Sequence, residues 1–383
     1  MDRRAFVVVL DACGVGALPD ADLYGDAGAN TLAHLAQTEG GLDLPVLAEL
    51  GLGSILPLAG VEPSPHPVTH GRLHALGPGK DSTAGHWELM GVITPAPLPT
   101  YPEGFPDEVI GALRGALGRG VLCNRPYNGI AAIDDHGAEH IRSGDLIVYT
   151  SQDSVLQVAA HVDVVAPDEL YAACVAARAV MAPPHAVGRV IARPFRGTPG
   201  HFRRTEGRRD YSLAPPGRSY LEEVRAGGLP VHAVGKVGQV FAGVGVDVEH
   251  PGATNAQALS AVSGLLGSLE RGLVVANLVE TDQVHGHRND GAGFHRALRE
   301  IDAAVGRWLP ALGPGDLLVL CADHGCDVTR PGTDHTREHA PLLAVYAGAG
   351  ARHEGPLADV GASVLRWLTG RAAPALPGTA FVP

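Results

Sequence analysis

Apolar runs that end in acidic or imidazole side chains are the feature that most constrains the fold of this chain. The run Leu317–Cys321 is followed by Asp323 and His324. A short apolar run of this kind is typical of a strand buried on both faces of a parallel sheet. Open α/β sheets carry their ligand sites at the carboxyl ends of such strands. Taken alone, the pair could also be a hydrogen-bonded Asp and His that only end the strand.

Similar runs recur along the chain and predict further strands. They cover residues 4–10, 144–149, 188–192, 231–234, 273–279 and 342–346. Helical patterns lie between several of them. In the segment 291–309, apolar residues recur at helical spacing and predict a helix with one face in the core: Phe294, Leu298, Ile301, Val305 and Trp308. Alternating strands and helices predict an α/β fold, with a mostly parallel sheet covered by helices on both faces.

The length of the chain and its proline-rich stretches predict two domains. A chain of 383 residues exceeds the usual size of a single hydrophobic core. Proline-rich stretches at 94–102 and 213–217 are typical of semi-rigid hinges. The segment between them has strand and helix patterns of its own. We therefore expect a catalytic core formed by residues 1–95 and 216–383, with a smaller α/β domain inserted at residues 96–215.

Charge and composition exclude several classes of partner. The net charge is −12, and no Lys/Arg block resembles a nucleic-acid footprint. No apolar segment is long enough to span a bilayer, and the apolar run near the N-terminus is too short for a signal-peptide core. The five scattered cysteines form no CxxC pair, which indicates free thiols in a reducing compartment. We expect a cytoplasmic protein without an evident obligate protein partner.

Residue types that bind metals follow three of the predicted strands or lie in a nearby loop. These residues are Asp11, Asp282, His287, Asp323, His324 and His335. Because the carboxyl ends of parallel strands share one edge of the sheet, these side chains can converge. Mixed carboxylate and imidazole ligands suit Mn²⁺ or Zn²⁺ rather than a thiolate site, and we expect none of the cysteines to contribute. Three Asp and three His residues suffice for two three-ligand sites.

The segment Lys80–His86 contains a candidate nucleophile, Ser82, in an expected strand-to-helix turn. A serine hydroxyl needs a base or a metal ion to become nucleophilic, because its own pKa lies far above neutrality. Paired divalent cations about 4 Å apart could bind its oxygen and a phosphate oxygen together. The simpler interpretation of this segment is a helix N-cap followed by a loop histidine.

Longer motifs are similar to those of the phosphopentomutases, a family of the alkaline phosphatase superfamily, along nearly the whole chain. They lie at residues 9–11 with 14–16, 79–82 with 85–88, 149–157, 188–194, 235–236, 282–288, 322–325 and 334–338. The Asp/Ser and Asp-His pieces mark the superfamily. Gly-His-Trp-Glu at 85–88 and the Thr-Ser-Gln-Asp-Ser-Val-Leu-Gln segment at 150–157 resemble the mutase specifically.

This resemblance implies an alkaline-phosphatase-like core with two Mn²⁺ ions and a phosphorylated enzyme intermediate. One ion would be held by Asp282, His287 and His335. The other would be held by Asp11, Asp323, His324 and the oxygen of Ser82. The implied activity interconverts ribose 1-phosphate and ribose 5-phosphate, and the corresponding 2-deoxyribose phosphates. A sugar bisphosphate such as glucose 1,6-bisphosphate or ribose 1,5-bisphosphate would prime Ser82, and the inserted domain would close over the site to exclude water.

The resemblance also implies the substrate contacts. Ser151 and Asp153 match the family's sugar-binding loop. Arg189, Arg204 and Lys236 would hold the distal phosphate, an arginine in bidentate fashion. Arg203 is the alternative to Arg204, because the sequence does not fix the register there, and each arginine could instead be a solvated surface charge.

The chain departs from the family pattern at three positions. Ser82 stands where the family usually has Thr, Ala84 where Thr is common, and His339 where an aromatic residue is usual. A serine hydroxyl attacks by the same chemistry. Thr83 is a rival nucleophile, although Ser82 directly follows Asp81 as the motif requires. The alternative functions are a metal-dependent phosphatase or phosphodiesterase of the same superfamily, a phosphoglycerate mutase, and a non-catalytic sugar-phosphate binding protein.

Overall fold

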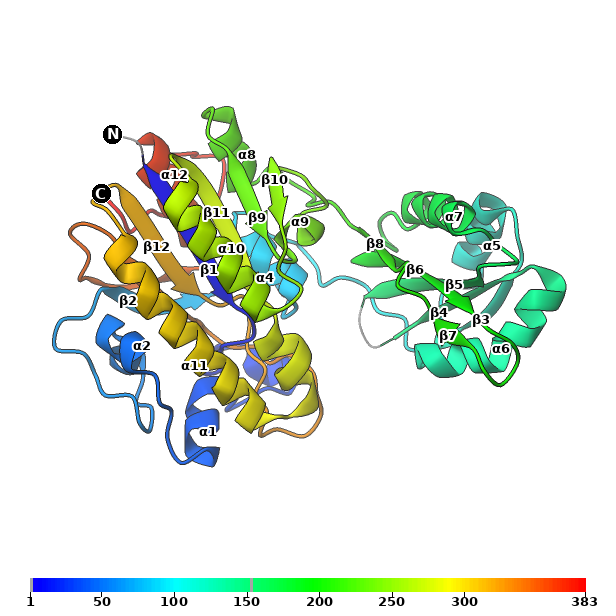
Figure 1. The fold of residues 1–383 in the computed structure, drawn as a ribbon, viewed down its shortest axis with the longest axis horizontal. Helices are drawn as coiled ribbons and strands as arrows, with labels where there is room; N and C mark the ends of the chain where they lie inside the picture. The colour runs from blue at the N-terminus through cyan, green and yellow to red at the C-terminus, as the bar shows by residue number, and fades with distance from the viewer. Residues whose placement is uncertain (1–2, 152–153) are drawn as a thin grey trace. The chain divides into compact units, whose positions relative to one another are not determined.

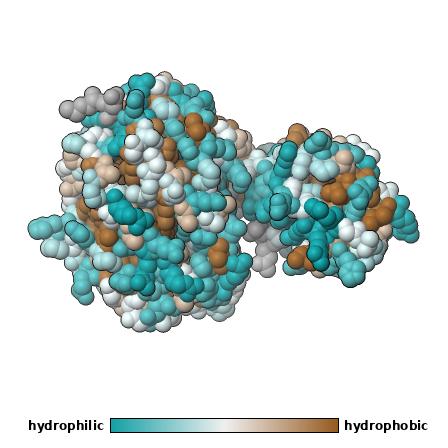
Figure 2. Space-filling view, in the orientation of Figure 1, coloured by the Kyte–Doolittle hydropathy of each residue, from teal (hydrophilic) through white to brown (hydrophobic). Residues whose placement is uncertain are grey.

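The computed structural model describes residues 3–151 and 154–383. The chain divides into two compact units (Figure 1). The first contains the described residues up to Ala96 together with Pro215–Pro383, and the second contains Pro97–Ala214. Figure 2 shows hydrophilic and hydrophobic residues intermingled on the visible face of each unit. That the second unit serves as a substrate domain stays a prediction.

The described part of the first unit contains an eight-stranded sheet. Its order is β10 (Val248–His250), β9 (Val231–Val234), β11 (Gly272–Leu278), β1 (Arg4–Leu10), β12 (Asp316–Cys321), β13 (Ala340–Val345), β2 (Thr69–His74) and β14 (Arg352–Pro356). The strands from β10 to β12 are parallel, β13 is antiparallel to both neighbours, and β14 is parallel to β2. The prediction of a mostly parallel sheet is confirmed.

Helices cover both faces of this sheet, as the two arginines at the start of β1 show. Arg4 donates to the carbonyl oxygens of Leu266 and Leu269, at the end of α10 (Asn255–Ser268). Its neighbour Arg3 donates to the carbonyl oxygen of Trp367 in α12 (Asp359–Thr369). Successive side chains of an extended chain point to opposite faces, so α10 and α12 lie on opposite sides of the sheet. Helix α11 packs beside α10 (Figure 1).

The predicted helix and strands are found, with shifted ends. Helix α11 spans Gly291–Trp308 and buries the predicted apolar stripe, which confirms that prediction. The strand expected at 144–149 begins later, because Gly144 adopts a left-handed conformation and caps the preceding helix α6 (Gly129–Ser143). Strands β2 and β14 were not predicted, since each consists mostly of polar residues and a glycine and lacks the continuous apolar run of a buried strand.

The second unit has its own sheet between two apolar cores. Among the described residues the sheet contains β3 (Val121–Pro126), β4 (Leu146–Thr150), β5 (Val155–His161), β6 (Arg189–Arg196) and β7 (Arg203–Arg204), with β8 (Arg209–Ser212) pairing with β6. Helices α5 (Asp107–Leu117) and α7 (Pro167–Val180) contribute to the larger core, and α6 contributes to the smaller one. No helix in the described ranges is both long and apolar enough to cross a membrane.

Candidate active site

Three neighbouring strands bring the candidate site together at their carboxyl ends. Strand β1 lies between β11 and β12, and all three are parallel. Asp11 follows β1, and Asp323 and His324 follow β12. Asp282 lies in the π-helical turn η2 (Thr281–His285) that follows β11. The hydroxyl of Thr281 donates to the carbonyl oxygen of Asp11 at 2.6 Å, which ties this turn to the end of β1.

Asp11, Asp323, His324 and Ser82 form a first cluster. Nε2 of His324 lies 3.4 Å from Oδ1 of Asp11 and 3.5 Å from Oδ2 of Asp323. The same nitrogen lies 3.1 Å from Oγ of Ser82. Both carboxylates are buried. Oδ1 of Asp11 accepts no hydrogen bond from any described residue, and Oδ2 of Asp323 also lies 3.0 Å from Nδ1 of His86. Three side chains from strand ends and one hydroxyl from a helix thus converge on one point.

Asp282, His287 and His335 form a second cluster next to the first. Nε2 of His287 lies 3.4 Å from Oδ2 of Asp282, and Nε2 of His335 lies 3.3 Å from Oδ1. The two imidazole nitrogens are 3.2 Å apart. Nδ1 of His287 donates to the carbonyl oxygen of Thr333 at 2.6 Å, which leaves Nε2 as the nitrogen that faces Asp282. The rings of His324 and His335 are 4.0 Å apart between centroids, so the two clusters adjoin.

The electrostatics of the two clusters fit divalent cations. Burial raises the pKa of Asp11, and the negative charges of Asp323 and Asp282 raise it further. Burial also works to raise the pKa of Asp323, but the positive charges of His324 and His86 outweigh it and lower the pKa to about 2. Carboxylates packed together in this way repel one another unless a cation lies among them. The mixed oxygen and nitrogen donors and the buried carboxylates fit divalent metal ions.

Ser82 is the first residue of helix α4 (Ser82–Leu89), and Asp81 is its N-cap. The Asp81 carboxylate accepts hydrogen bonds from the backbone N–H groups of Thr83 and Ala84. The segment does contain a helix N-cap, Asp81, as the simpler interpretation expects. The other part of that interpretation is wrong, because His86 lies on the helix rather than in a loop.

His86 is a residue of the site that sequence reasoning missed. It is buried, and its Nδ1 lies 2.8 Å from the carbonyl oxygen of Ser82 and 3.0 Å from Oδ2 of Asp323. Because both neighbours are acceptors, Nδ1 carries the proton and orients the Asp323 carboxylate. Its spacing of four residues from Ser82, one turn along the same helix, is the signal that could have identified it.

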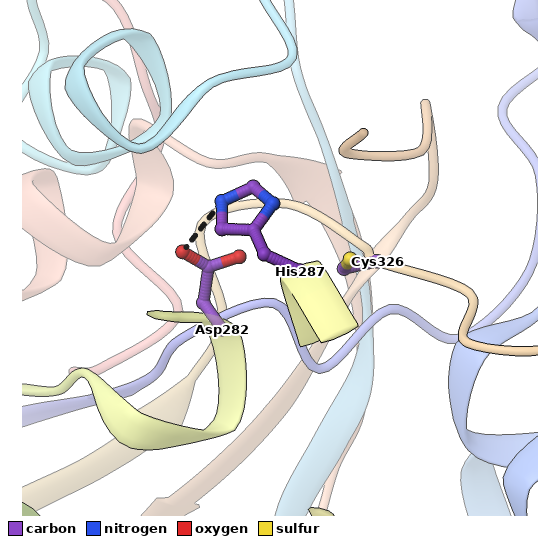
Figure 3. Close-up of side chains that lie close together, drawn as sticks. All are labelled: Asp282, His287 and Cys326. Carbon is purple, nitrogen blue, oxygen red and sulfur yellow. Dashed lines mark ion pairs between the residues drawn. The ribbon is translucent and has the colours of Figure 1, made fainter. Parts of the chain in front are cut away.

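One cysteine lies beside the metal-ligating residues, although the sequence led us to expect that none contributes to the site. Cys326, Asp282 and His287 each have one ligand atom within 4.8 Å of those of the other two. Figure 3 shows Asp282 facing His287, with Cys326 beside that imidazole. The chain turns back after His324, and the backbone N–H of Cys326 donates to the carbonyl oxygen of Ala12. This turn is a tertiary feature with no signature in the spacing of the cysteines.

Comparison with known proteins identifies the family. The family model described as "Metalloenzyme superfamily" matches residues 3–370. A phosphopentomutase from Anaeromyxobacter dehalogenans is 49% identical over 372 residues, covering 96% of each chain. Another, from Caldanaerobacter subterraneus, is 47% identical over 349 residues, covering 91% of this chain and 88% of the relative. This chain belongs to the phosphopentomutase family. It is therefore a mutase, an isomerase that acts on a small sugar phosphate and binds divalent metal.

A solved structure agrees with this family in fold. Phosphoglycerate mutase from Leishmania mexicana has a TM-score of 0.52 and 13% sequence identity, and the match covers 99% of this chain and 97% of that chain. At this identity the likeness concerns the fold alone. Together with the superfamily match and the observed sheet, it confirms the prediction of an alkaline-phosphatase-like α/β fold.

The substrate contacts implied by the phosphopentomutase resemblance are divided between the two units. Ser151 follows β4, Arg189 begins β6, and Arg204 lies in β7, all in the second unit. Lys236 belongs to the first unit and precedes the short helix α9 (Val237–Val240). Asp153 lies outside the described residues.

The arginines of the second unit differ in their surroundings. Nη1 of Arg189 lies 3.7 Å from Oδ2 of Asp210 in β8. In the β6–β7 pairing, Arg204 lies opposite Phe195 and Arg203 lies opposite Arg196. Both residues of β7 are exposed, so the choice between them as the substrate contact stays a prediction.

His339 lies in the loop before β13, where its backbone pairs with that of Val15 and Gly16. Burial lowers the pKa of its imidazole, and the positive charge of Arg72 lowers it further. These backbone hydrogen bonds hold the segment before β13 against residues 15 and 16.

Proposed function

We propose that this protein is a phosphopentomutase that interconverts ribose 1-phosphate and ribose 5-phosphate, and the 2-deoxyribose phosphates, through a phosphorylated Ser82. The observation that carries the proposal is the position of the Ser82 hydroxyl, 3.1 Å from Nε2 of His324 and next to the carboxylates of the first cluster. A hydroxyl held among such groups is the arrangement that an activated nucleophile requires. The family membership supports the same reaction class.

We propose that the two clusters hold two divalent cations. Their mixed oxygen and nitrogen donors suit Mn²⁺ or Zn²⁺, and the family resemblance favours Mn²⁺. Asp282, His287 and His335 would hold one ion. Asp11, Asp323, His324 and the Ser82 oxygen would hold the other. When bound, such ions lower the pKa of a bound hydroxyl and neutralise the charge of a transferring phosphoryl group. The buried carboxylate oxygens of Asp11, Asp282 and Asp323, which face imidazole nitrogens of the same site, support this assignment.

In the proposed reaction, phospho-Ser82 transfers its phosphoryl group to the free hydroxyl of a bound pentose monophosphate. The bond between phosphorus and the Ser82 oxygen breaks, a bond to the sugar oxygen forms, and the proton of the sugar hydroxyl replaces phosphorus on Ser82. The resulting bisphosphate reorients and returns its other phosphoryl group to Ser82. Atoms and charge are thereby conserved, and the net change is an isomerisation.

The surroundings of Ser82 favour a phosphorylated side chain. Ser82 lies in the first turn of helix α4, where the partial positive charge of the helix end stabilises an added phosphate. His86 would act as a positioning residue, because its Nδ1 contacts both Asp323 and the carbonyl oxygen of Ser82. One imidazole thus fixes the nucleophile and a proposed metal ligand relative to each other.

We further propose that Ser151 and Asp153 bind sugar hydroxyls, and that Arg189, Arg204 and Lys236 bind the distal phosphate. Arginine suits this role because its planar fork pairs with two phosphate oxygens. A sugar bisphosphate, such as glucose 1,6-bisphosphate or ribose 1,5-bisphosphate, would phosphorylate Ser82 initially. The free state of all five cysteines supports a reducing, cytoplasmic location.

The test compares Ser82→Ala with Thr83→Ala, which removes the neighbouring rival hydroxyl. We expect Ser82→Ala to lower the rate of ribose 1-phosphate conversion with Mn²⁺ by more than about 10³-fold, as removal of a nucleophile does. Thr83→Ala should retain most of the activity, since the backbone N–H of Thr83 that binds Asp81 is unchanged. Wild-type activity in Ser82→Ala would refute the assignment of the nucleophile.

The same assay distinguishes a mutase from a hydrolase of the superfamily. Ribose 1-phosphate and ribose 5-phosphate are followed with and without glucose 1,6-bisphosphate, while inorganic phosphate is measured in parallel. A mutase gives isomerisation that the bisphosphate stimulates, with little phosphate released. Phosphate release at the rate of isomerisation would instead favour the phosphatase alternative.

A further inference from the structure

Cys326 lies against the cluster formed by Asp282, His287 and His335. It is only 1% exposed, and its Sγ is one of three ligand atoms, with those of Asp282 and His287, that lie within 4.8 Å of one another (Figure 3). A Cβ atom built on Gly286 would lie 3.0 Å from this sulfur. The thiol therefore packs directly on the main chain that carries His287, and a larger residue at Gly286 would displace it.

A second observation at the same place, the buried carboxylate of Asp282, points to a cation-binding position. The Asp282 side chain is buried, and its Oδ1 accepts no hydrogen bond from the residues that the structure describes. Nε2 of His335, itself a proposed ligand, lies 3.3 Å from this oxygen. Leaving a buried carboxylate oxygen unpaired is costly unless a cation satisfies it. A carboxylate, an imidazole and a thiol are together a donor set that suits Zn²⁺ or Cd²⁺, because thiolate sulfur is a soft ligand.

The thiol of Cys326 has a weak partner of its own. Sγ of Cys326 lies 3.7 Å from the carbonyl oxygen of Asp334, to which it donates. A hard cation such as Mn²⁺ prefers oxygen and nitrogen ligands and leaves this thiol in place, whereas a thiophilic cation gains from recruiting it.

We propose that Cys326 is a conditional metal ligand, which binds Zn²⁺ or Cd²⁺ together with Asp282 and His287 but does not bind Mn²⁺. The inference rests on the proposed metal position at Asp282. When the metal–sulfur bond forms, the thiol proton leaves to water and the contact with the Asp334 carbonyl breaks. The identity of the bound metal thereby decides how many ligands the protein supplies at this position.

The experiment titrates the metal-free full-length protein with Cd²⁺, in the absence of substrate. Ultraviolet absorption by the cadmium–thiolate bond reports sulfur ligation, and competition with a chromophoric chelator reports affinity. We expect Cys326→Ser to abolish the absorption and to weaken Cd²⁺ binding by at least about 10-fold. Its Mn²⁺ affinity should stay within about 3-fold of wild type, because Mn²⁺ does not use the sulfur.

Cys13→Ser is the matched control. Cys13 is also buried beside the site, with Sγ 3.8 Å from the carbonyl oxygen of Asp11, but it belongs to none of the ligand groups found among the described residues. This variant should keep both the absorption and the Cd²⁺ affinity. Retention of the absorption by Cys326→Ser, or its loss in Cys13→Ser, would overturn the proposal, as would an equal loss of Mn²⁺ affinity.

X-ray absorption by the Cd²⁺-loaded wild-type protein keeps the proposal testable if the variant does not fold. One sulfur neighbour of the metal is expected, and an all-nitrogen-and-oxygen shell would overturn the inference. Because these measurements need no turnover, they are independent of the test of Ser82. A mutase whose Cd²⁺ lacks sulfur would refute this inference alone, and sulfur ligation in a protein without mutase activity would refute the proposed function alone.

Discussion

Replacing Gly85 by alanine should impair catalysis although every proposed ligand keeps its side chain. Gly85 lies in helix α4, three residues after Ser82. A Cβ atom at this position would lie 2.3 Å from the carbonyl oxygen and 2.8 Å from the carbonyl carbon of Asp323. These are backbone atoms at the end of β12, which cannot rotate away as a flexible side chain can. The helix itself has to move outward by about 1 Å to restore an ordinary contact.

The size of the effect follows from that displacement. Overpacking of this kind costs roughly 1–3 kcal/mol of folding free energy. Because Ser82 moves with the helix, its hydroxyl is displaced from His324, to which the present distance is 3.1 Å. A misplacement of about 1 Å typically costs on the order of 10²-fold in rate. We therefore expect a loss of about 10²-fold in mutase activity from a protein that still folds.

The assay compares this variant with Gly264→Ala, a control within helix α10. A Cβ atom at Gly264 would meet nothing within 4 Å, so alanine there should be neutral or stabilising by up to about 1 kcal/mol. Mutase activity and unfolding in denaturant are measured for both variants. If Gly85→Ala keeps activity within about 3-fold of wild type and unfolds like the control, the argument from close packing is wrong.

Two further predictions concern stability and metal. Asp327 accepts hydrogen bonds from the backbone of Asn30, from His34 and from Thr329. Burial alone would raise the pKa of Asp327, but these bonds lower it. Its contribution to folding stability is therefore full above about pH 4 and is lost as the pH falls through the lowered pKa. Asp327→Asn should cost about 2 kcal/mol at pH 7, and the difference from wild type in denaturant unfolding should shrink below pH 4; a pH-independent difference would contradict this. Exhaustive chelation of the metal should abolish mutase activity and lower the free energy of unfolding. Adding Mn²⁺ at about 100 times its Kd should restore about 2.7 kcal/mol of that free energy. Denaturant unfolding measures the stability, and elemental analysis measures the metal content. Full activity in demonstrably metal-free protein would contradict the proposed role of the buried carboxylates.

The sequence supplied the framework of the site because its signal is local. Each apolar run followed by Asp11 or Asp323 marks a buried strand and its carboxyl end without reference to any other segment. The stripe of helix α11 likewise follows from periodicity alone. Antiparallel strand β13 and the edge strand β14 depend on neighbours that lie far away in the sequence, and their pairing was not predictable from local pattern.

Contacts across the site depend on distances that only the folded chain specifies. His86 meets Asp323 because helix α4 packs on the end of β12, where Gly85 permits a close approach. Cys326 reaches Asp282 because the loop after His324 folds back onto the chain near Ala12. The scattered cysteines carry no local sign of these neighbours. The spacing of His86 from Ser82 indicates a shared helix face, but not the contact with Asp323.

By itself, then, the sequence determined the parallel strands, the residue types at their carboxyl ends and the family to which the chain belongs. Tertiary structure alone decided which side chains meet: Ser82 with His324, His86 with Asp323, and Cys326 with the carboxylate of Asp282. The physical reason is that strand burial and helix periodicity are encoded within a few neighbouring residues. Contact between side chains hundreds of residues apart depends on the register and packing of the entire sheet.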